Sequence, residues 1–273
     1  MRVRGNNPNQ TTGLNQRARG GFTLLDVLVS IAVIVLLISI VLPSLRKANE
    51  SARRVVCQSN IRQIGIGILS YADDYQGYLP PSEFIRSRIL ASKMPQQMIS
   101  AKLGAEQQSS MSTEVTWDGL GILYSSQYTT AAQVFYCPSH RGQHRFKSYA
   151  DRWNGDEGEI VVNYHYRGEG PAGIDRWTGR PIASTRVLFE IDPKQTSLIA
   201  DGMRVRDDFN HEVGSNFFRA DLSVLWFSDP SRRLLASLPT DVNSATAASV
   251  TAAWTWFDSN TSFPAVVEES GPD

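Results

Sequence analysis

The sequence predicts an α+β protein in which one long N-terminal helix, with a transmembrane half and an amphipathic half, packs on an antiparallel β-sheet head. Three observations support this class. Residues 22–42 are almost wholly apolar, residues 44–75 carry apolar side chains at helical spacing, and β-branched or aromatic segments bounded by Gly, Pro and Asp come later. A helix followed by several strands is typical of an α+β fold.

Composition limits the classes of function. Apolar residues make up 41% of the 273 residues and charged residues 20%, so most of the chain should fold. Basic and acidic residues balance at 27 each, which gives no bias toward nucleic acid or acidic substrates, and we expect no nucleic-acid partner. The charge is unevenly distributed, however, because residues 1–21 contain four arginines and no acid. This asymmetry predicts a leader peptide over 1–21.

Residues 22–42 predict a transmembrane helix. They read FTLLDVLVSIAVIVLLISIVL, with Asp26 as the only charge and no Gly or Pro. As a helix they would span about 30 Å, the thickness of the hydrocarbon core. A secretory signal fits poorly because the small residues Gly20 and Gly21 precede the apolar run instead of following it. We therefore expect processing ahead of the helix, which stays on the mature chain.

Asp26 is the unusual residue of this segment. A carboxylate at the bilayer centre costs roughly 2.5–3.5 kcal/mol, but Asp26 lies only about one turn from the helix end, where the cost is smaller. One interpretation is an interfacial Asp that reaches water. The other is a partner inside the membrane, the free ammonium of Phe22 from the same subunit or a neighbour.

Residues 19–29, RGGFTLLDVLV, resemble the class III signal of type IV pilins and type II secretion pseudopilins. The resemblance implies that a prepilin peptidase cuts between Gly21 and Phe22 and N-methylates Phe22. It also implies that Asp26 serves assembly with sister pilin or pseudopilin subunits. The family usually has Glu where this chain has Asp26, so the pairing group is one methylene shorter. Pro43 falls where many members carry a proline that kinks the helix.

The same resemblance sets the expected topology, and the residue patterns set the expected domain organisation. It places the leader in the cytoplasm and the head outside, on a single-pass protein of the inner membrane; positive charges flank the helix on both sides and do not decide its orientation. The expected parts are listed in chain order: leader peptide 1–21, transmembrane helix 22–42, amphipathic continuation 43–79, globular α+β head 80–240 and C-terminal extension 241–273.

The later chain carries strand signals. Two segments are predicted to pair as a hairpin, Phe217-Phe218 with residues 223–227. Trp254 and Trp256 are by default core residues; on a strand, however, they would share one face and could contact a carbohydrate or partner if exposed. The other expected strands are 134–136, 160–166, 186–191 and 197–200.

A second resemblance covers more of the chain. Residues 57–65, 71–77 and 135–138, with nine residues between His211 and Asp221, resemble planctomycete-type prepilin-like proteins, whose C-terminal signature is His-x9-Asp-Gly. Leu222 stands in place of the glycine. Since Leu disfavours positive φ, we expect a different turn type here or a degenerate motif.

Cys57 and Cys137 are the only cysteines, and outside the cytoplasm they could oxidise. A disulfide would close a loop of about 80 residues and stabilise the fold by roughly 4 kcal/mol in the chain-entropy model. The alternative is two unpaired buried thiols.

Metal binding has weaker signals. Cys137, His140 and His144 offer three ligands, with His165 or His211 as a fourth, but a polar loop with solvated histidines is the favoured interpretation. The acidic pairs lack the spacing of a known calcium loop, so we expect no cofactor and leave calcium open. These pairs are Asp73-Asp74, Asp156-Glu157 and Asp207-Asp208.

No enzyme signature is present in the sequence. His211 and Asp221 could suggest acid–base chemistry, but a structural polar contact within a hairpin is the simpler interpretation. We therefore expect no enzyme, and a structural pilin-like or pseudopilin subunit of a type II secretion or type IV pilus-like filament. The alternative is a membrane-tethered extracytoplasmic binding module that does not polymerise.

Overall fold

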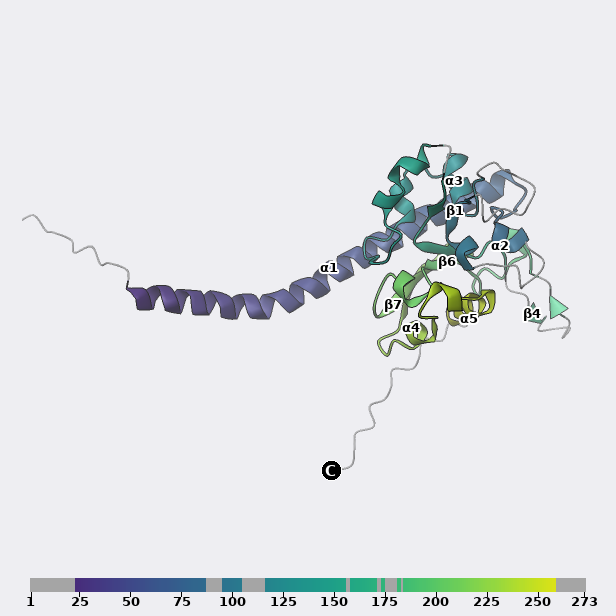
Figure 1. Cartoon of the computed structure of the whole chain (residues 1–273). Helices are drawn as coiled ribbons and strands as arrows, with labels where there is room; N and C mark the ends of the chain where they lie inside the picture. Colours follow the sequence, from purple (N-terminus) through teal and green to yellow (C-terminus); the bar gives the residue numbers. More distant parts are fainter. Residues whose placement is uncertain are drawn as a thin grey trace, which may run out of the picture. The chain divides into compact units, whose positions relative to one another are not determined.

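The structure, a computed structural model, describes residues 23–86, 95–104, 116–155, 158–170, 173–174, 181–182 and 184–258. It confirms the α+β class (Figure 1). The helices are α1 (Leu24–Asp74), α2 (Glu83–Arg86), α3 (Gly121–Ser125), α4 (Arg233–Ser237) and α5 (Ala247–Asp258). The strands are β1 (Ser100–Lys102), β2 (Ile160–Val161), β3 (Tyr164–Tyr166), β4 (Gly173–Ile174), β5 (Pro181–Ile182), β6 (Ser197–Asp201), β7 (Gly214–Arg219) and β8 (Val224–Ser228).

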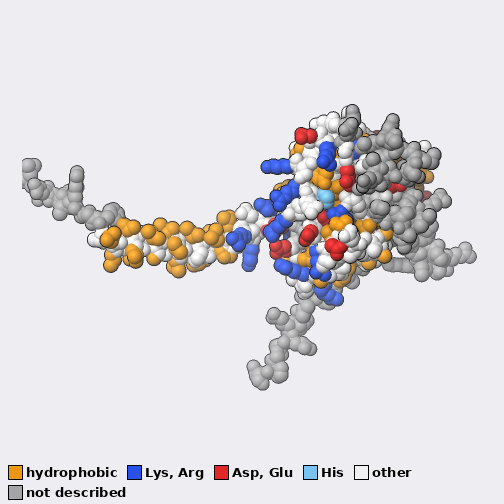
Figure 2. Space-filling view, viewed as in Figure 1, with side chains coloured by type: hydrophobic (Ala, Val, Ile, Leu, Met, Phe, Trp, Pro, Cys, Tyr) orange, Lys and Arg blue, Asp and Glu red, His pale blue; other side chains and the backbone are white. Residues whose placement is uncertain are grey.

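The chain divides into two compact units, Met1–Ala48 and Asn49–Asp273. In the first unit, α1 runs through Pro43, and the large apolar side chains from Leu24 to Leu45 are exposed along it (Figure 2, orange). By length and composition this helix could cross a membrane, consistent with a single-pass anchor. Lys and Arg side chains gather on the next part of α1, which Figure 2 shows in blue.

In the second unit, α1 buries one face in the head. Cys57, Ile61, Ile64 and Ile68 recur every three or four residues and are fully or almost fully buried. Gly65 belongs to this face because a Cβ there would lie 2.2 Å from the ring of Phe218 on β7. The helix ends where Gln76 takes φ 56° and the Gly77 N–H donates to the Ala72 carbonyl at 2.7 Å, a Schellman-type ending.

A four-stranded antiparallel sheet in the order β3-β6-β7-β8 forms the centre of the head. The predicted hairpin is confirmed, since β7 pairs with β8 from Gly214 opposite Ser228 to Phe218 opposite Val224. Strand β6 lies between β3 and β7, and its five residues are all buried. The central position of β6 places its last residue, Asp201, inside the head.

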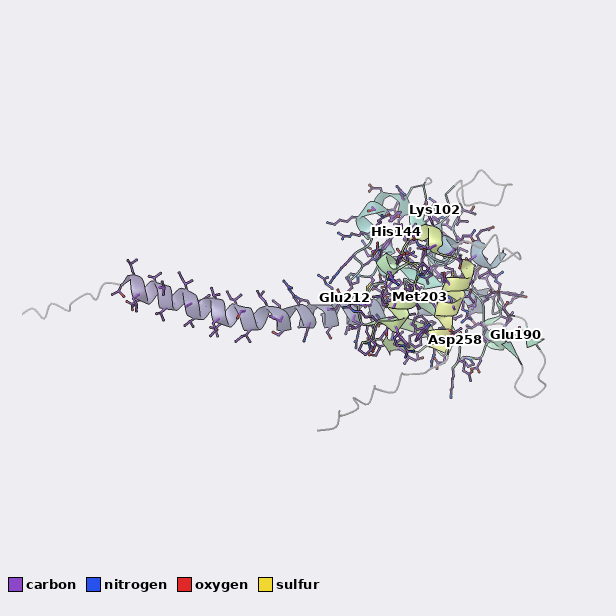
Figure 3. The ribbon with its side chains drawn as sticks, turned by 60° about the horizontal axis from the view of Figure 1, so that its bottom comes forward. Lys102, His144, Glu190, Met203, Glu212 and Asp258 are labelled. Carbon is purple, nitrogen blue, oxygen red and sulfur yellow. A yellow bond between two sulfur atoms is a disulfide. The ribbon has the colours of Figure 1, made fainter. Side chains whose placement is uncertain are left out.

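The prediction of a strand around Trp254 and Trp256 is wrong, because these residues lie on helix α5. Trp254 is 1% exposed and packs in a second core cluster with Phe217 and Phe257, while Trp256 is half-buried. Residues two apart on a helix point in different directions, so the two rings form no common face. Asp258, labelled in Figure 3, ends α5, accepting a hydrogen bond from the Ser197 backbone and pairing with Arg167.

Two predicted strands form 3₁₀ helices instead, η4 (Ala132–Phe135) and η7 (Leu188–Glu190). Their apolar residues Phe135 and Leu188 are buried in the main core, and Val187 forms an isolated β-bridge with Tyr78. Residues with high strand propensity are those whose side chains pack well on a half-buried surface. Here the same side chains pack in the core from a 3₁₀ helix, without a neighbouring strand.

Candidate functional site

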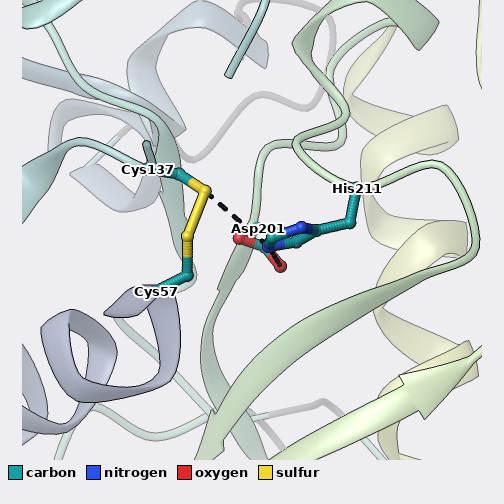
Figure 4. A group of neighbouring side chains, drawn as sticks. All are labelled: Cys57, Cys137, Asp201 and His211. Carbon is teal, nitrogen blue, oxygen red and sulfur yellow. Dashed lines mark hydrogen bonds and ion pairs between the residues drawn. A yellow bond between two sulfur atoms is a disulfide. The ribbon is translucent and has the colours of Figure 1, made fainter. Parts of the chain in front are cut away.

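A buried polar cluster lies where α1 meets the sheet of the head (Figure 4). A disulfide joins Cys57 on α1 to Cys137 just after η4, with the two Cα atoms 5.4 Å apart. Asp201 reaches the cluster from the end of β6, and His211 from the loop before β7. All four side chains are buried.

His211 connects α1 to this cluster. Its Nδ1 lies 2.7 Å from Oε1 of Glu50, which also accepts a hydrogen bond from the Ser139 hydroxyl. Its Nε2 accepts from the Asn216 amide at 3.2 Å and lies 3.7 Å from both Cys137 Sγ and Asp201 Oδ2. The Glu50 contact favours the tautomer with the proton on Nδ1, which turns the Nε2 lone pair toward Cys137 and Asp201.

Asp201 is a fully buried carboxyl group with several donors around it. The backbone N–H of Asn216 donates to its Oδ2, and the side-chain amide of Asn210 donates to its Oδ1 at 2.9 Å. Burial raises the pKa of Asp201, while nearby His211 and these hydrogen bonds lower it. The group is thus a buried acid kept in place by its neighbours.

The prediction of solvated histidines in the segment 137–144 is wrong. His140 is buried and its Nδ1 bonds Asn210, and burial lowers the pKa of His140. His144 is half-buried between the Tyr149 hydroxyl, 2.7 Å from Nδ1, and the Arg204 guanidinium, which donates to Nε2. The Cys137 sulfur is in the disulfide, so these three residues do not share one centre.

His165 is buried with its Nδ1 accepting from the backbone N–H of Met203 at 2.9 Å. Met203 is labelled in Figure 3. His165 Nε2 therefore carries the proton, and it is buried with no hydrogen-bond partner among the residues that the structure describes. Burial, together with the charge of Arg204, lowers the pKa of His165 to about 3.

The predicted contact between His211 and Asp221 is also wrong. Asp221 lies in the turn between β7 and β8, where its carboxylate accepts hydrogen bonds from the backbone and hydroxyl of Ser223. Leu222 follows with φ 72°, which contradicts the expectation of a different turn type. The turn keeps the left-handed conformation that glycine favours, and a leucine occupies it.

One member of each described acidic pair makes an ordinary contact. Asp74 accepts a hydrogen bond from the Tyr128 hydroxyl, and Asp208 is buried in an ion pair with Arg204. Asp156 and Glu157 lie outside the described residues.

The start of α1 forms a second candidate site. The predicted cleavage site, Gly21 and Phe22, lies outside the described residues. The Thr23 N–H donates to the Asp26 carboxylate at 3.0 Å, and the Asp26 N–H donates to the Thr23 hydroxyl at 3.2 Å. This reciprocal pair is a capping box, so Asp26 has a local role in starting the helix.

Sequence reasoning missed Glu50, Asp201 and Asn216, and it missed the capping box. A signal existed for two of these. Glu50 and Cys57 are seven residues apart and therefore share one helix face, and Thr23-x-x-Asp26 before an apolar run is a capping pattern. Asp201 and Asn216 had no local signal, because only the sheet brings them to His211.

Comparisons with known proteins give two likenesses. Residues 46–207, more than half of the chain, match the family described as SBP_bac_10, Protein of unknown function (DUF1559). Sixty residues are 35% identical to the ComG operon protein 3 homolog of Bacillus licheniformis, over 22% of this chain and 62% of that protein. The match thus covers less than two thirds of that relative. No solved structure matches the chain.

Proposed function

The chain belongs to the family described as Protein of unknown function (DUF1559), and on that premise we propose that it is a pilin-like subunit that acts by assembly. The α+β fold with its long apolar helix and the likeness to a ComG operon protein point to a pilin-like family. The finer proposal is a type II secretion or type IV pilus-like filament, built from subunits of the planctomycete-type prepilin-like group. Its role is structural, and the subunit carries out no chemistry of its own.

The observation that carries this proposal is the surface of α1. In the segment from Leu24 to Leu45 the large apolar side chains are exposed on all sides of the helix. The surface of an ordinary soluble protein exposes only scattered apolar residues. Lipid covers such a helix in the membrane, and sister helices cover it in a filament. Helix association there depends on packing and on the few polar groups available.

Processing of the N-terminus would convert the membrane-anchored subunit into one that can enter a filament. In this proposal a prepilin peptidase of the inner membrane cuts between Gly21 and Phe22 and methylates Phe22, with the head outside the cytoplasm. The new ammonium lies one residue before the Thr23–Asp26 capping box. Asp26 then has two tasks, to cap its own helix and to pair with the ammonium of a neighbouring subunit.

The head is held to its part of α1 by two links. The Cys57–Cys137 disulfide and the contact between Glu50 and His211 both join the helix to the sheet region. These two links would keep the head fixed on its part of α1 when neighbouring subunits contact the head in a filament. A membrane-tethered binding module would use the same anchor without assembly.

Two variants separate the tasks of Asp26. Asp26→Asn removes the charge but keeps an oxygen that can accept from the Thr23 N–H, whereas Thr23→Val removes the capping hydroxyl and keeps the charge. Chemical cross-linking in the native membrane reads out subunit contacts. We expect cross-linked multimers for the wild type and for Thr23→Val, and none for Asp26→Asn. Equal multimers in Asp26→Asn, or none in the wild type, would favour the tethered module.

A further inference from the structure

Four different side chains of the buried cluster present metal-ligand atoms to one point. The sulfurs of Cys57 and Cys137, an oxygen of Asp201 and a nitrogen of His211 all lie within 4.8 Å of one another. Figure 4 shows the imidazole and the carboxylate beside the two sulfurs. Two thiolates, an imidazole and a carboxylate form a donor set that suits Zn²⁺.

Two of the separations between these ligand atoms agree with a tetrahedral centre. Zinc bonds of roughly 2.0–2.3 Å place neighbouring ligand atoms about 3.3–3.8 Å apart. His211 Nε2 is 3.7 Å from Cys137 Sγ and 3.7 Å from Asp201 Oδ2. The Cα atoms of the two cysteines are 5.4 Å apart, so side-chain rotation alone can part the sulfurs.

The surroundings of His211 support the same reading. Glu50 holds the proton on Nδ1 at 2.7 Å, which leaves the Nε2 lone pair for a metal. A carboxylate behind a ligating histidine is the usual arrangement in zinc proteins, where it orients the ring and increases its basicity. Asn216 donates to Nε2 when the disulfide is present, and this one hydrogen bond would be given up to the metal.

We propose that Cys57, Cys137, Asp201 and His211 form a zinc site whenever the two cysteines are in the thiol form. The disulfide and the metal exclude each other, because a disulfide sulfur is not a thiolate ligand. A dithiol reductant supplies two electrons and two protons, becomes a disulfide itself, and leaves two cysteine thiols. Zinc then binds both sulfurs as thiolates and releases their two protons.

This site gives the head two alternative links at one place. The disulfide joins α1 to the segment after η4 in the oxidised chain, and zinc joins α1, that segment, β6 and the His211 loop in the thiol form. Before oxidation, zinc binding would therefore stabilise the head and protect both thiols. The inference does not depend on assembly of the subunit.

The test uses the full chain in detergent, reduced anaerobically with a phosphine, which is then removed. Co²⁺ is titrated in as a spectroscopic probe, and bound zinc is measured by metal analysis. We expect one metal per reduced chain with a thiolate-to-cobalt charge-transfer band, and no binding by the oxidised chain. His211→Gln and Asp201→Asn should weaken binding at least tenfold, whereas the matched control His144→Gln should leave it unchanged.

A second measurement needs no variant and so avoids any loss of folding. Air reoxidation of the reduced wild type is followed by alkylation and mass spectrometry, with and without zinc. Zinc should slow the return of the disulfide at least tenfold. Absence of metal binding by the reduced wild type, equal binding by folded His211→Gln, or reoxidation at the same rate with zinc would overturn the proposal.

Discussion

Leu222 sits at the tip of the β7–β8 hairpin with a left-handed backbone and a half-exposed side chain. Its φ is 72° and its side chain is 46% exposed. Its N–H donates to the carbonyl of Arg219, and the Arg219 N–H donates to the carbonyl of Ser223. This is a turn followed by a bulge position where glycine is the favoured residue. The leucine makes the turn at a cost in backbone strain, since few L-residues adopt this conformation.

Leu222→Gly should therefore stabilise the head. Glycine removes the strain energy of the left-handed backbone but increases the conformational entropy of the unfolded chain. Because the first free energy is the larger, we expect the free energy of unfolding to rise by up to about 1 kcal/mol. Denaturant unfolding of the chain in detergent, followed by tryptophan fluorescence, measures it. Leu222→Ala is the matched control, because it shortens the side chain and keeps the strain. Equal effects of the two substitutions would mean that the backbone of residue 222 is not strained.

His165 makes the head sensitive to acid. Burial lowers the pKa of His165 to about 3, so the folded protein keeps it neutral where the unfolded chain protonates it near pH 6.5. The unfolded chain thus binds more protons below that pH, and stability is lost as the pH falls. Between pH 7.5 and 5.5 this histidine alone should lower the free energy of unfolding by about 1 kcal/mol.

His165→Asn should reduce this pH dependence by that amount, because Asn can accept from the Met203 N–H but does not titrate. Denaturant unfolding at the two pH values measures the difference for each chain. His140 also contributes, since burial lowers its pKa, so some acid sensitivity should remain. A variant with an unchanged pH dependence would show that His165 is not buried in the neutral form.

At the scale of elements, the packing of α1 on the sheet depends on Gly65. A methyl group there would lie 2.2 Å from the Phe218 ring, whereas on an exposed helix face Gly→Ala would stabilise by about 1 kcal/mol. We expect Gly65→Ala to lower the free energy of unfolding by about 1–3 kcal/mol through overpacking. Gln63→Ala, on the exposed side of the same helix, is the control and should change it by less than about 0.5 kcal/mol. A stabilised Gly65→Ala chain would contradict the close contact.

The elements that the sequence predicted well are those with a local signal. Helix α1 and the β7–β8 hairpin follow from periodicity and from turn residues within one short segment. Segments 134–136 and 186–191 contain the same residue types as strands but form 3₁₀ turns, because packing against the core decides their shape. Helix α5 was not predicted, because its Ala, Ser and Thr residues suggested no regular element and Trp254 and Trp256 suggested a strand.

At the scale of the whole molecule, the candidate site could be predicted only in part. Pairing of the two cysteines could be proposed from the sequence because the chain has no others. Glu50 and His211 are 161 residues apart, and Asp201 approaches them only because β6 is central in the sheet. No local pattern encodes these contacts. The sequence offered Cys137, His140 and His144 as a weak metal candidate, and in the structure the two histidines bind other side chains.

The most direct test of the proposed function is intact mass with N-terminal sequencing of the protein from its native membrane. The resemblance of residues 19–29 to a class III signal leads us to expect a chain that begins at methylated Phe22. That result would fit cleavage after Gly21 and a subunit ready for assembly. A chain that still begins at Met1 would contradict the account, because Asp26 would then have no ammonium partner and α1 would serve as a simple anchor.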